Sequence, residues 1–193
     1  MSKIRLTLRV YDGKKVDPKK LEVEKECHSW DLQFLPQLMC FCAVPPVTQY
    51  YEVGHNLKTL SAGQMSIWGV AIPGVGTVTH GIIVGTGTGV ESPTDYAIGS
   101  IIGHGTAANQ LSYGAGTFTE PAVSGTTSVF KFARVFTNSS PTNPITVKEF
   151  AIYCYNQVAF NFCMSRDLTG DVNIANGGAS KTIEVTVTVD NTS

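Results

Sequence analysis

The chain has 193 residues, of which 15% are charged, and a formal net charge of −1; this length suits one domain that buries roughly 70% of its unfolded surface. A pI near 6.4 argues against a nucleic-acid-binding protein, whose domain usually has a pI above about 9. The apolar runs are far shorter than the ~20 residues that span a bilayer, which argues against a membrane protein.

The cysteines form an odd set without a paired framework, and the N-terminal MSKIRLTLRV has no apolar signal core. Both features are typical of a protein made in a cytosol. We therefore expect reduced thiols at Cys27, Cys40, Cys42, Cys154 and Cys163.

The first predicted element is a β-hairpin. Apolar and polar residues alternate over residues 4–10, which is the period of a half-buried strand. Asp12-Gly13 supplies a turn, and Leu21 and Val23 alternate with glutamates in the returning strand. A two-stranded hairpin is marginal alone, so its apolar face should pack on the rest of the chain or on a neighbour.

A short, broken helix should follow the hairpin. Ser29 is a candidate N-cap, apolar residues recur at three- or four-residue spacing from Trp30 onward, and Pro36 interrupts the pattern. We expect residues 1–48 to form an N-terminal arm or packing element made of hairpin and helix. Residues 49–193 should form a β-sandwich body.

Residues 59–130 contain no Lys or Arg, and Glu91, Asp95 and Glu120 are their only charged residues. This stretch holds 14 of the 19 glycines, which predicts turns and short strands rather than helix. A weakly charged surface of this size is easier to explain if neighbouring subunits cover part of it, because interface cores are depleted in charged side chains.

Strand patterns dominate beyond residue 125. Apolar and polar residues alternate over 158–164 and 183–189, two more strands are indicated at 128–136 and 150–154, and Gly, Pro and Asn turns separate them. The fold class predicted is mainly β, an antiparallel β-sandwich (jelly-roll-like) preceded by a β-hairpin and a short helix.

Two glycine-rich segments match nucleotide-binding loops only in part. Gly85-Thr-Gly87-Thr-Gly89 lacks the Lys that a phosphate loop needs after its last glycine. The segment beginning at Gly103 fits a dinucleotide fingerprint but is not followed by a helical pattern. Both are better explained as backbone that needs glycine for turns or close approach, so we expect no cofactor.

We predict no metal site. His28, His55, His80 and His104 do not share a ligand spacing, and Cys40-x-Cys42 is not a CxxC motif. Residues 167–173 lack the acidic ladder and closing Glu of a calcium loop. They are better explained as a polar turn between strands.

We also predict no catalytic residue, and therefore no enzyme. The chain has no Gly-x-Ser-x-Gly segment. Glu91 and Asp95 could be imagined as an acid and base pair, and Asp95, His104 and a serine as a triad, but a triad is defined by geometry. With so few carboxylates in such a long stretch, coincidence is the default explanation.

One block resembles a segment of structural proteins of tailed bacteriophages. HGIIVGTGTGVESPTDYAIGSIIGHGTAANQLSYG, residues 80–114, is similar to that family's succession of GIVVGTG, DYAL, AHG and QLxYG. Residues 135–154 and 162–189 resemble the family's later FTN, ITVKE and C-terminal strand segments. The resemblance covers most of the chain beyond the hairpin and helix, and it implies a part of a virion.

The implied function is that of a minor capsid or decoration (cement) protein, which stabilises the shell through subunit contacts. Its partners would be copies of itself and other virion proteins such as the major capsid protein, with no nucleic acid and no membrane. It would be made in the host bacterial cytoplasm and reside in the virion. One alternative is a tail, neck or baseplate protein that binds a host receptor or glycan. The other is a sandwich-type hydrolase, which would need two carboxylates converging in a cleft.

The contact surface is expected in the loops and strands of residues 81–116. Asp95 could cap a short helical turn after Pro93, and a tight bend is expected around His104. The candidate interface residues are Gly81, Gly85, Gly87, Asp95, Tyr96, His104 and Tyr113.

Overall fold

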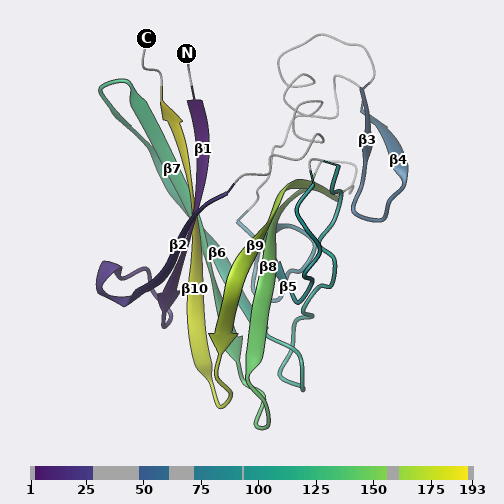
Figure 1. Cartoon of the computed structure of the whole chain (residues 1–193), viewed down its shortest axis with the longest axis vertical. Coiled ribbons are helices and arrows are strands. Elements are labelled where there is room, and N and C mark those ends of the chain that lie inside the picture. Colours follow the sequence, from purple (N-terminus) through teal and green to yellow (C-terminus); the bar gives the residue numbers. More distant parts are fainter. Residues whose placement is uncertain (1–2, 28–47, 61–71, 93, 156–160, 191–193) are drawn as a thin grey trace.

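Figure 1 shows the computed structural model, which describes residues 3–27, 48–60, 72–92, 94–155 and 161–190. Strands predominate in these ranges, and the named strands all pair antiparallel. The predicted antiparallel β-sandwich is confirmed. No helix in these ranges is long and apolar enough to cross a membrane.

The larger sheet has five strands in the order β2-β1-β10-β7-β6. Their bounds are β1 (Lys3–Asp12), β2 (Leu21–Cys27), β6 (Ser112–Ser124), β7 (Thr127–Asn138) and β10 (Ala179–Asp190). The hairpin predicted at the N-terminus is confirmed as β1 and β2. It lies in the same sheet as the body, because β1 pairs along its whole length with β10.

The smaller sheet has the order β5-β8-β9, from β5 (Gly81–Gly85), β8 (Ile145–Tyr155) and β9 (Asn161–Ile174). A separate hairpin consists of β3 (Thr48–Tyr51) and β4 (Leu57–Leu60). β6 and β7 extend past the end of the smaller sheet, and their connection forms a projecting tip close to both chain ends (Figure 1). The larger sheet therefore has a portion that the smaller sheet does not cover.

The core lies between the two sheets and takes its side chains from both. Leu8 of β1 and Val185 of β10 lie opposite each other in the larger sheet, and both are fully buried. They belong to the same apolar cluster as Ile83 of β5 and Phe150 of β8. Burying each such side chain stabilises the fold by roughly 1.5–3 kcal/mol. The apolar face of the hairpin thus packs on the body, as its marginal stability alone required.

The short helix predicted from Ser29 lies outside the described residues. The helical element that the described ranges contain is a 3-10 turn, Pro18–Lys20, in the connection between β1 and β2. Asp17 caps it, since its side chain accepts a hydrogen bond from the backbone nitrogen of Lys19 at 3.0 Å. Pro18 at the first position suits a helix start, because its missing N–H is not needed there.

The described cysteines, Cys27, Cys154 and Cys163, are buried, and none of them forms a disulfide. Burial raises the pKa of Cys27 and of Cys154 to about 12. Since the thiolate is the reactive form, these two side chains behave as small apolar groups at neutral pH. Cys40 and Cys42 lie outside the described ranges.

Candidate functional site

The loops of the uncharged stretch are held by charged side chains from strands outside it. Arg134 of β7 is 1% exposed. Its guanidinium donates hydrogen bonds to the carbonyls of Gly114 at 2.9 Å, Ile82 at 3.2 Å and Gly74 at 3.2 Å. Burial lowers its pKa to about 10, so the group stays charged at neutral pH. One cation thus joins β5, β6 and the segment before β5.

Glu149 of β8 performs the complementary task for backbone N–H groups. Its carboxylate is fully buried and accepts hydrogen bonds from the amides of Gly87 at 2.7 Å, Ser100 at 2.9 Å and Gly99 at 3.1 Å. It also accepts one from Arg166 Nε at 2.8 Å. Because the carboxylate itself is fully buried, it needs these donors: a buried charged group without hydrogen-bond partners would cost more than about 1–3 kcal/mol.

Arg166 of β9 links this carboxylate to the loop before residue 100. Its Nη1 lies 2.7 Å from Asp95 Oδ2, and its Nη2 donates to the carbonyl of Gly89 at 2.9 Å. Burial lowers the pKa of Arg166, but the hydrogen bonds to Asp95 and Glu149 outweigh it and leave the pKa raised. We call Glu149, Arg166 and Asp95 the ionic cluster.

The carboxylates considered as an acid and base pair each have partners within the chain. Glu91 accepts a hydrogen bond from the amide of Leu168 at 2.9 Å and one from Lys25 Nζ at 3.3 Å. The Leu168 amide and Lys25 lower the pKa of Glu91. Asp95 belongs to the ionic cluster, and it also accepts from the amide of Ser92 at 3.0 Å. No helical turn follows Asp95; residues 96–100 form bends and irregular backbone.

The glycines of residues 81–116 have reasons inside the molecule. A Cβ at Gly85 would lie 2.7 Å from Glu149 Oε1, and one at Gly87 would overlap the same carboxylate. Gly81 has a φ of 84°, and its Cβ would lie 2.6 Å from Pro73 Cγ. Without a Cβ the backbone can approach these groups closely and adopt positive φ. Close packing onto Glu149 and Pro73 therefore explains why Gly81, Gly85 and Gly87 are glycines.

Tyr113 is fully buried and lies between the two sheets. Its hydroxyl donates to the carbonyl of Ile102 at 2.6 Å and lies 3.4 Å from the amide of Val84. The Arg134 guanidinium lies 4.8 Å from the centre of its ring, within range of a cation–π contact. Burial raises the pKa of Tyr113 to about 12.

His104 is exposed, and its Nδ1 accepts a hydrogen bond from the amide of Tyr113 at 3.1 Å. Its ring therefore helps to close the bend predicted around it. Tyr96 is half-buried and stacks on His55, with ring centres 4.2 Å apart. This stack lies between the segment after Asp95 and the β3–β4 hairpin.

The seven predicted contact residues thus differ in position. Only the exposed ones could reach another subunit with their side chains in this conformation. Gly81, Gly85 and Tyr113 are buried, Gly87, Asp95 and Tyr96 are half-buried, and His104 is exposed.

A different set of residues in the same stretch forms an exposed apolar surface. It consists of side chains on β6 and on residues 72–76, which lie along β6 through hydrogen bonds of Gly116 N to the Pro73 carbonyl and Gly76 N to the Tyr113 carbonyl. We call this the β6 surface; its residues and exposed fractions are Ile72 (64%), Val75 (75%), Phe118 (45%) and Val123 (75%). The sequence does not predict this surface, because a strand of mixed Gly, Thr and Pro gives no alternation that distinguishes an exposed apolar residue from a buried one.

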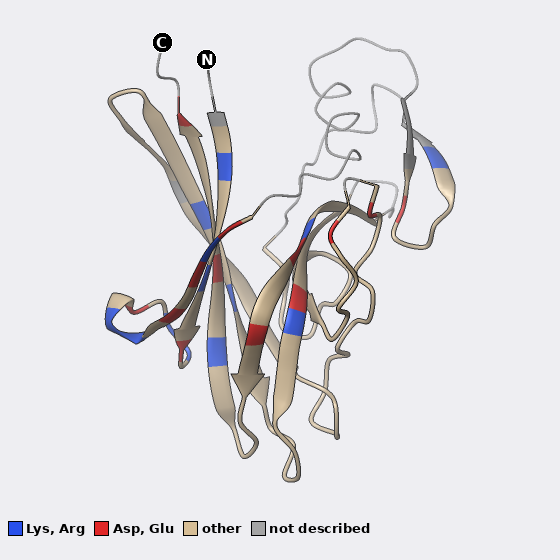
Figure 2. Ribbon diagram, in the orientation of Figure 1, with Lys and Arg blue, Asp and Glu red and all other residues tan. Residues whose placement is uncertain are grey.

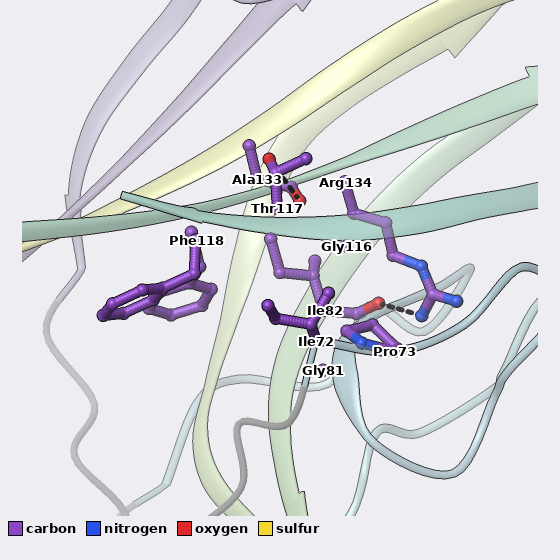
Figure 3. Close-up of a pocket in the computed structure, with 10 residues that line it drawn as sticks. Ile72, Pro73, Gly81, Ile82, Gly116, Thr117, Phe118, Ala133 and Arg134 are labelled. Carbon is purple, nitrogen blue, oxygen red and sulfur yellow. Dashed lines mark hydrogen bonds between the residues drawn. The ribbon is translucent and has the colours of Figure 1, made fainter. Parts of the chain in front are cut away.

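Figure 3 shows a hollow at this edge of the sandwich, where β6 meets β5. Ile72, Ile82 and Phe118 line it, with Pro73 beside the guanidinium of Arg134. Phe118 also contacts Phe130 of β7, with ring centres 6.0 Å apart. The hollow is apolar and open at the side of the molecule where the sheet ends.

In the part of the chain that the structure describes, no three His, Cys, Asp or Glu side chains are grouped so as to hold a metal ion. No protein-family model, no curated protein and no solved structure matches this chain. The function is therefore argued from its own residues.

Proposed function

We propose that the chain is a structural subunit of a bacteriophage virion, a minor capsid or decoration protein that stabilises the shell through contacts with its own copies and with the major capsid protein. The observation that carries the proposal is the β6 surface. Exposed apolar groups gathered along one strand are typical of interaction sites. The absence of Lys and Arg from residues 59–130 matches the depletion of charge in interface cores.

The two edges of the larger sheet support the same proposal by their contrast. β2, at one edge, carries Glu22, Glu24, Lys25 and Glu26, and charged side chains protect an edge strand against pairing with another chain. β6, at the opposite edge, has Glu120 as its only charged residue. Within the described residues, residues 72–76 bind the outer edge of β6 at Tyr113 and Gly116, and no named strand pairs with the rest of that edge. An added strand from a partner would be stabilised there by main-chain hydrogen bonds.

The test is to count the chain in purified particles of the phage whose genome encodes it, by quantitative mass spectrometry against the major capsid protein. We expect many copies, in a fixed ratio to the shell subunits. Three, six or twelve copies would favour the tail, neck or baseplate alternative. Absence from the particles would overturn the proposal.

A substitution tests the surface itself. Phe118→Ser should weaken the association of the chain with its own copies, measured by native mass spectrometry. Phe118 is nearly half exposed, so its side chain is removed from water only when a partner covers it. Thr119→Ser, on the next residue of the same strand, is the matched control. Unchanged association of Phe118→Ser would exclude the β6 surface as the contact.

A further inference from the structure

The connection between β1 and β2 carries four lysines within seven residues, Lys14, Lys15, Lys19 and Lys20. All four are exposed, and none forms a salt bridge with a described carboxylate. Figure 2 shows them as blue segments at the tip of the hairpin, at the left of the view. We call this group the lysine tip.

Of the other cations whose side chains the structure describes, all but Lys148 are engaged. Arg134 binds backbone carbonyls, and the remaining ones pair with carboxylates. They are Arg5, Arg9, Lys25, Lys58, Lys131, Arg166 and Lys181. Uncommitted positive charge is thus concentrated at one place, in a chain whose net charge is −1.

The lysine tip is also held in place by the body. Gly13 N donates to the Ser180 carbonyl at 2.8 Å, and Thr182 Oγ1 donates to the Gly13 carbonyl at 2.8 Å. The neighbouring acids do not cancel the charge, because Asp12 and Glu22 both bind Lys181. Within residues 13–20, Asp17 is the only acid, and it caps the 3-10 turn.

An open hollow adjoins the lysine tip on the outer face of the larger sheet. Lys14, Lys15 and Val16 stand at its side, and its floor, the rest of the lining, comes from β6, β7 and β10: Ala115, Thr117, Ala133, Arg134, Val135 and Thr182. The floor offers no carboxylate that would repel an anion. A flat strip of sheet with small side chains suits an extended peptide segment.

We propose that the lysine tip and this hollow bind an extended acidic segment of a partner protein, with its carboxylates on the lysines and its small side chains on the floor. In an extended segment, alternate side chains point to opposite sides, and residues on one side recur every ~6.8 Å. One side can therefore carry carboxylates while the other contacts Ala115 and Ala133. Nucleic acid fits less well, because a phosphate backbone needs a basic track longer than one hairpin tip.

The inference is independent of the virion proposal, since it rests on the lysine tip and the adjoining hollow and not on the exposed apolar side chains of the β6 surface. The probe is a fluorescein-labelled ten-residue peptide of alternating Glu and Ala, titrated with the full chain and followed by fluorescence anisotropy at pH 7. A peptide of alternating Gln and Ala and a ten-nucleotide oligo-dT of the same label are the comparison probes. We expect saturable binding of the Glu-Ala peptide alone, weakened when NaCl rises from about 50 mM to about 500 mM.

The double variants Lys14→Gln with Lys15→Gln and Lys19→Gln with Lys20→Gln should each weaken peptide binding about fivefold, as expected for the loss of two exposed charge contacts. Lys148→Gln, which removes an uncommitted cation on β8, should change it less than twofold. Thermal unfolding of all variants should match the parent, because these side chains form no contacts that the fold needs. No saturable binding, equal binding of the Gln-Ala peptide, tighter binding of oligo-dT, or double variants that behave like Lys148→Gln would each overturn the inference.

Discussion

Replacing Glu149 by Gln tests whether the ionic cluster holds the loops of the uncharged stretch. In the native chain Oε1 accepts from Gly87 N and Ser100 N, while Oε2 accepts from Gly99 N and Arg166 Nε. A glutamine presents an NH2 group at one of these positions, so at least two donors would face a donor. The Arg166 charge would also lose its fully buried partner.

Breaking a buried pair by removing one partner costs about 3–5 kcal/mol. For a protein of this size each 1 kcal/mol lowers the melting temperature by about 2–4 °C, so Glu149→Gln should lower it by about 6–20 °C in a thermal scan followed by circular dichroism. The matched control is Glu24→Gln, which removes an exposed carboxylate that pairs with Arg9 across β1 and β2. Exposed pairs contribute little to stability, so the control should change the melting temperature far less.

Hydrogen exchange gives the local result of the same substitution. The amides of Gly87, Gly99 and Ser100 should lose protection in Glu149→Gln before the strands of the sandwich open, because local openings need less free energy than global unfolding. If Glu149→Gln lowers the melting temperature no more than Glu24→Gln does, and these amides stay protected, the cluster does not hold the loops and the reasoning fails.

Three further predictions concern the same part of the molecule. Gly87→Ala should lower the free energy of unfolding by about 1–3 kcal/mol in urea denaturation, because its Cβ would overlap a buried carboxylate. Gly89→Ala is the control and should be close to neutral, since its Cβ would lie 3.7 Å from the nearest described atom. Equal effects of the two substitutions would contradict the packing argument. Tyr113→Phe should lower the free energy of unfolding by about 1–2 kcal/mol in the same assay, because the Ile102 carbonyl, which the hydroxyl binds at 2.6 Å, loses its donor. An unchanged denaturation midpoint would show that the hydroxyl is dispensable. The pKa of Glu91 is lowered on folding, so the ionised carboxylate stabilises the fold fully above about pH 4.3, its unfolded pKa, and this stabilisation is lost as the pH falls through the folded pKa. The difference in free energy of unfolding between the parent and Glu91→Gln should therefore shrink in acid. A difference that stays constant from pH 7 to pH 3 would refute this role of Glu91.

Alternation of apolar and polar residues predicts the strands that have one face in the core. Residues 4–10 and 183–189 alternate cleanly because their strands, β1 and β10, each have one face in the core. The sequence does not predict β6 as one long strand, because its register against β7 shifts twice and its sequence contains Gly and Pro. Alternation of apolar and polar residues predicts a regular strand, but it does not predict a strand that is interrupted by bulges.

The ionic cluster could not be predicted from the sequence. Glu149 and Arg166 each lie in an otherwise ordinary strand pattern, and only the pairing of β8 with β9 brings them together. The sequence predicts that the glycines of residues 85–89 and 103–105 serve turns or close backbone approach, but it does not identify the groups that they approach. The close approach of glycines to Glu149 and Pro73 depends on tertiary structure, which spacing along the chain does not contain.

The pairing of β1 with β10 has a consequence for biosynthesis. The residues of β1 are synthesised before those of β10. Their partners in β10 begin at Lys181, which is 154 positions after β2 ends at Cys27. At translation rates of ~5–20 residues per second, the hairpin waits roughly 8–30 s for the strand that completes its sheet. During that time the nascent chain exposes Leu6, Leu8 and Val10, the side chains that β10 later helps to bury. A chaperone that binds short apolar strands would therefore act on this protein at its first ten residues.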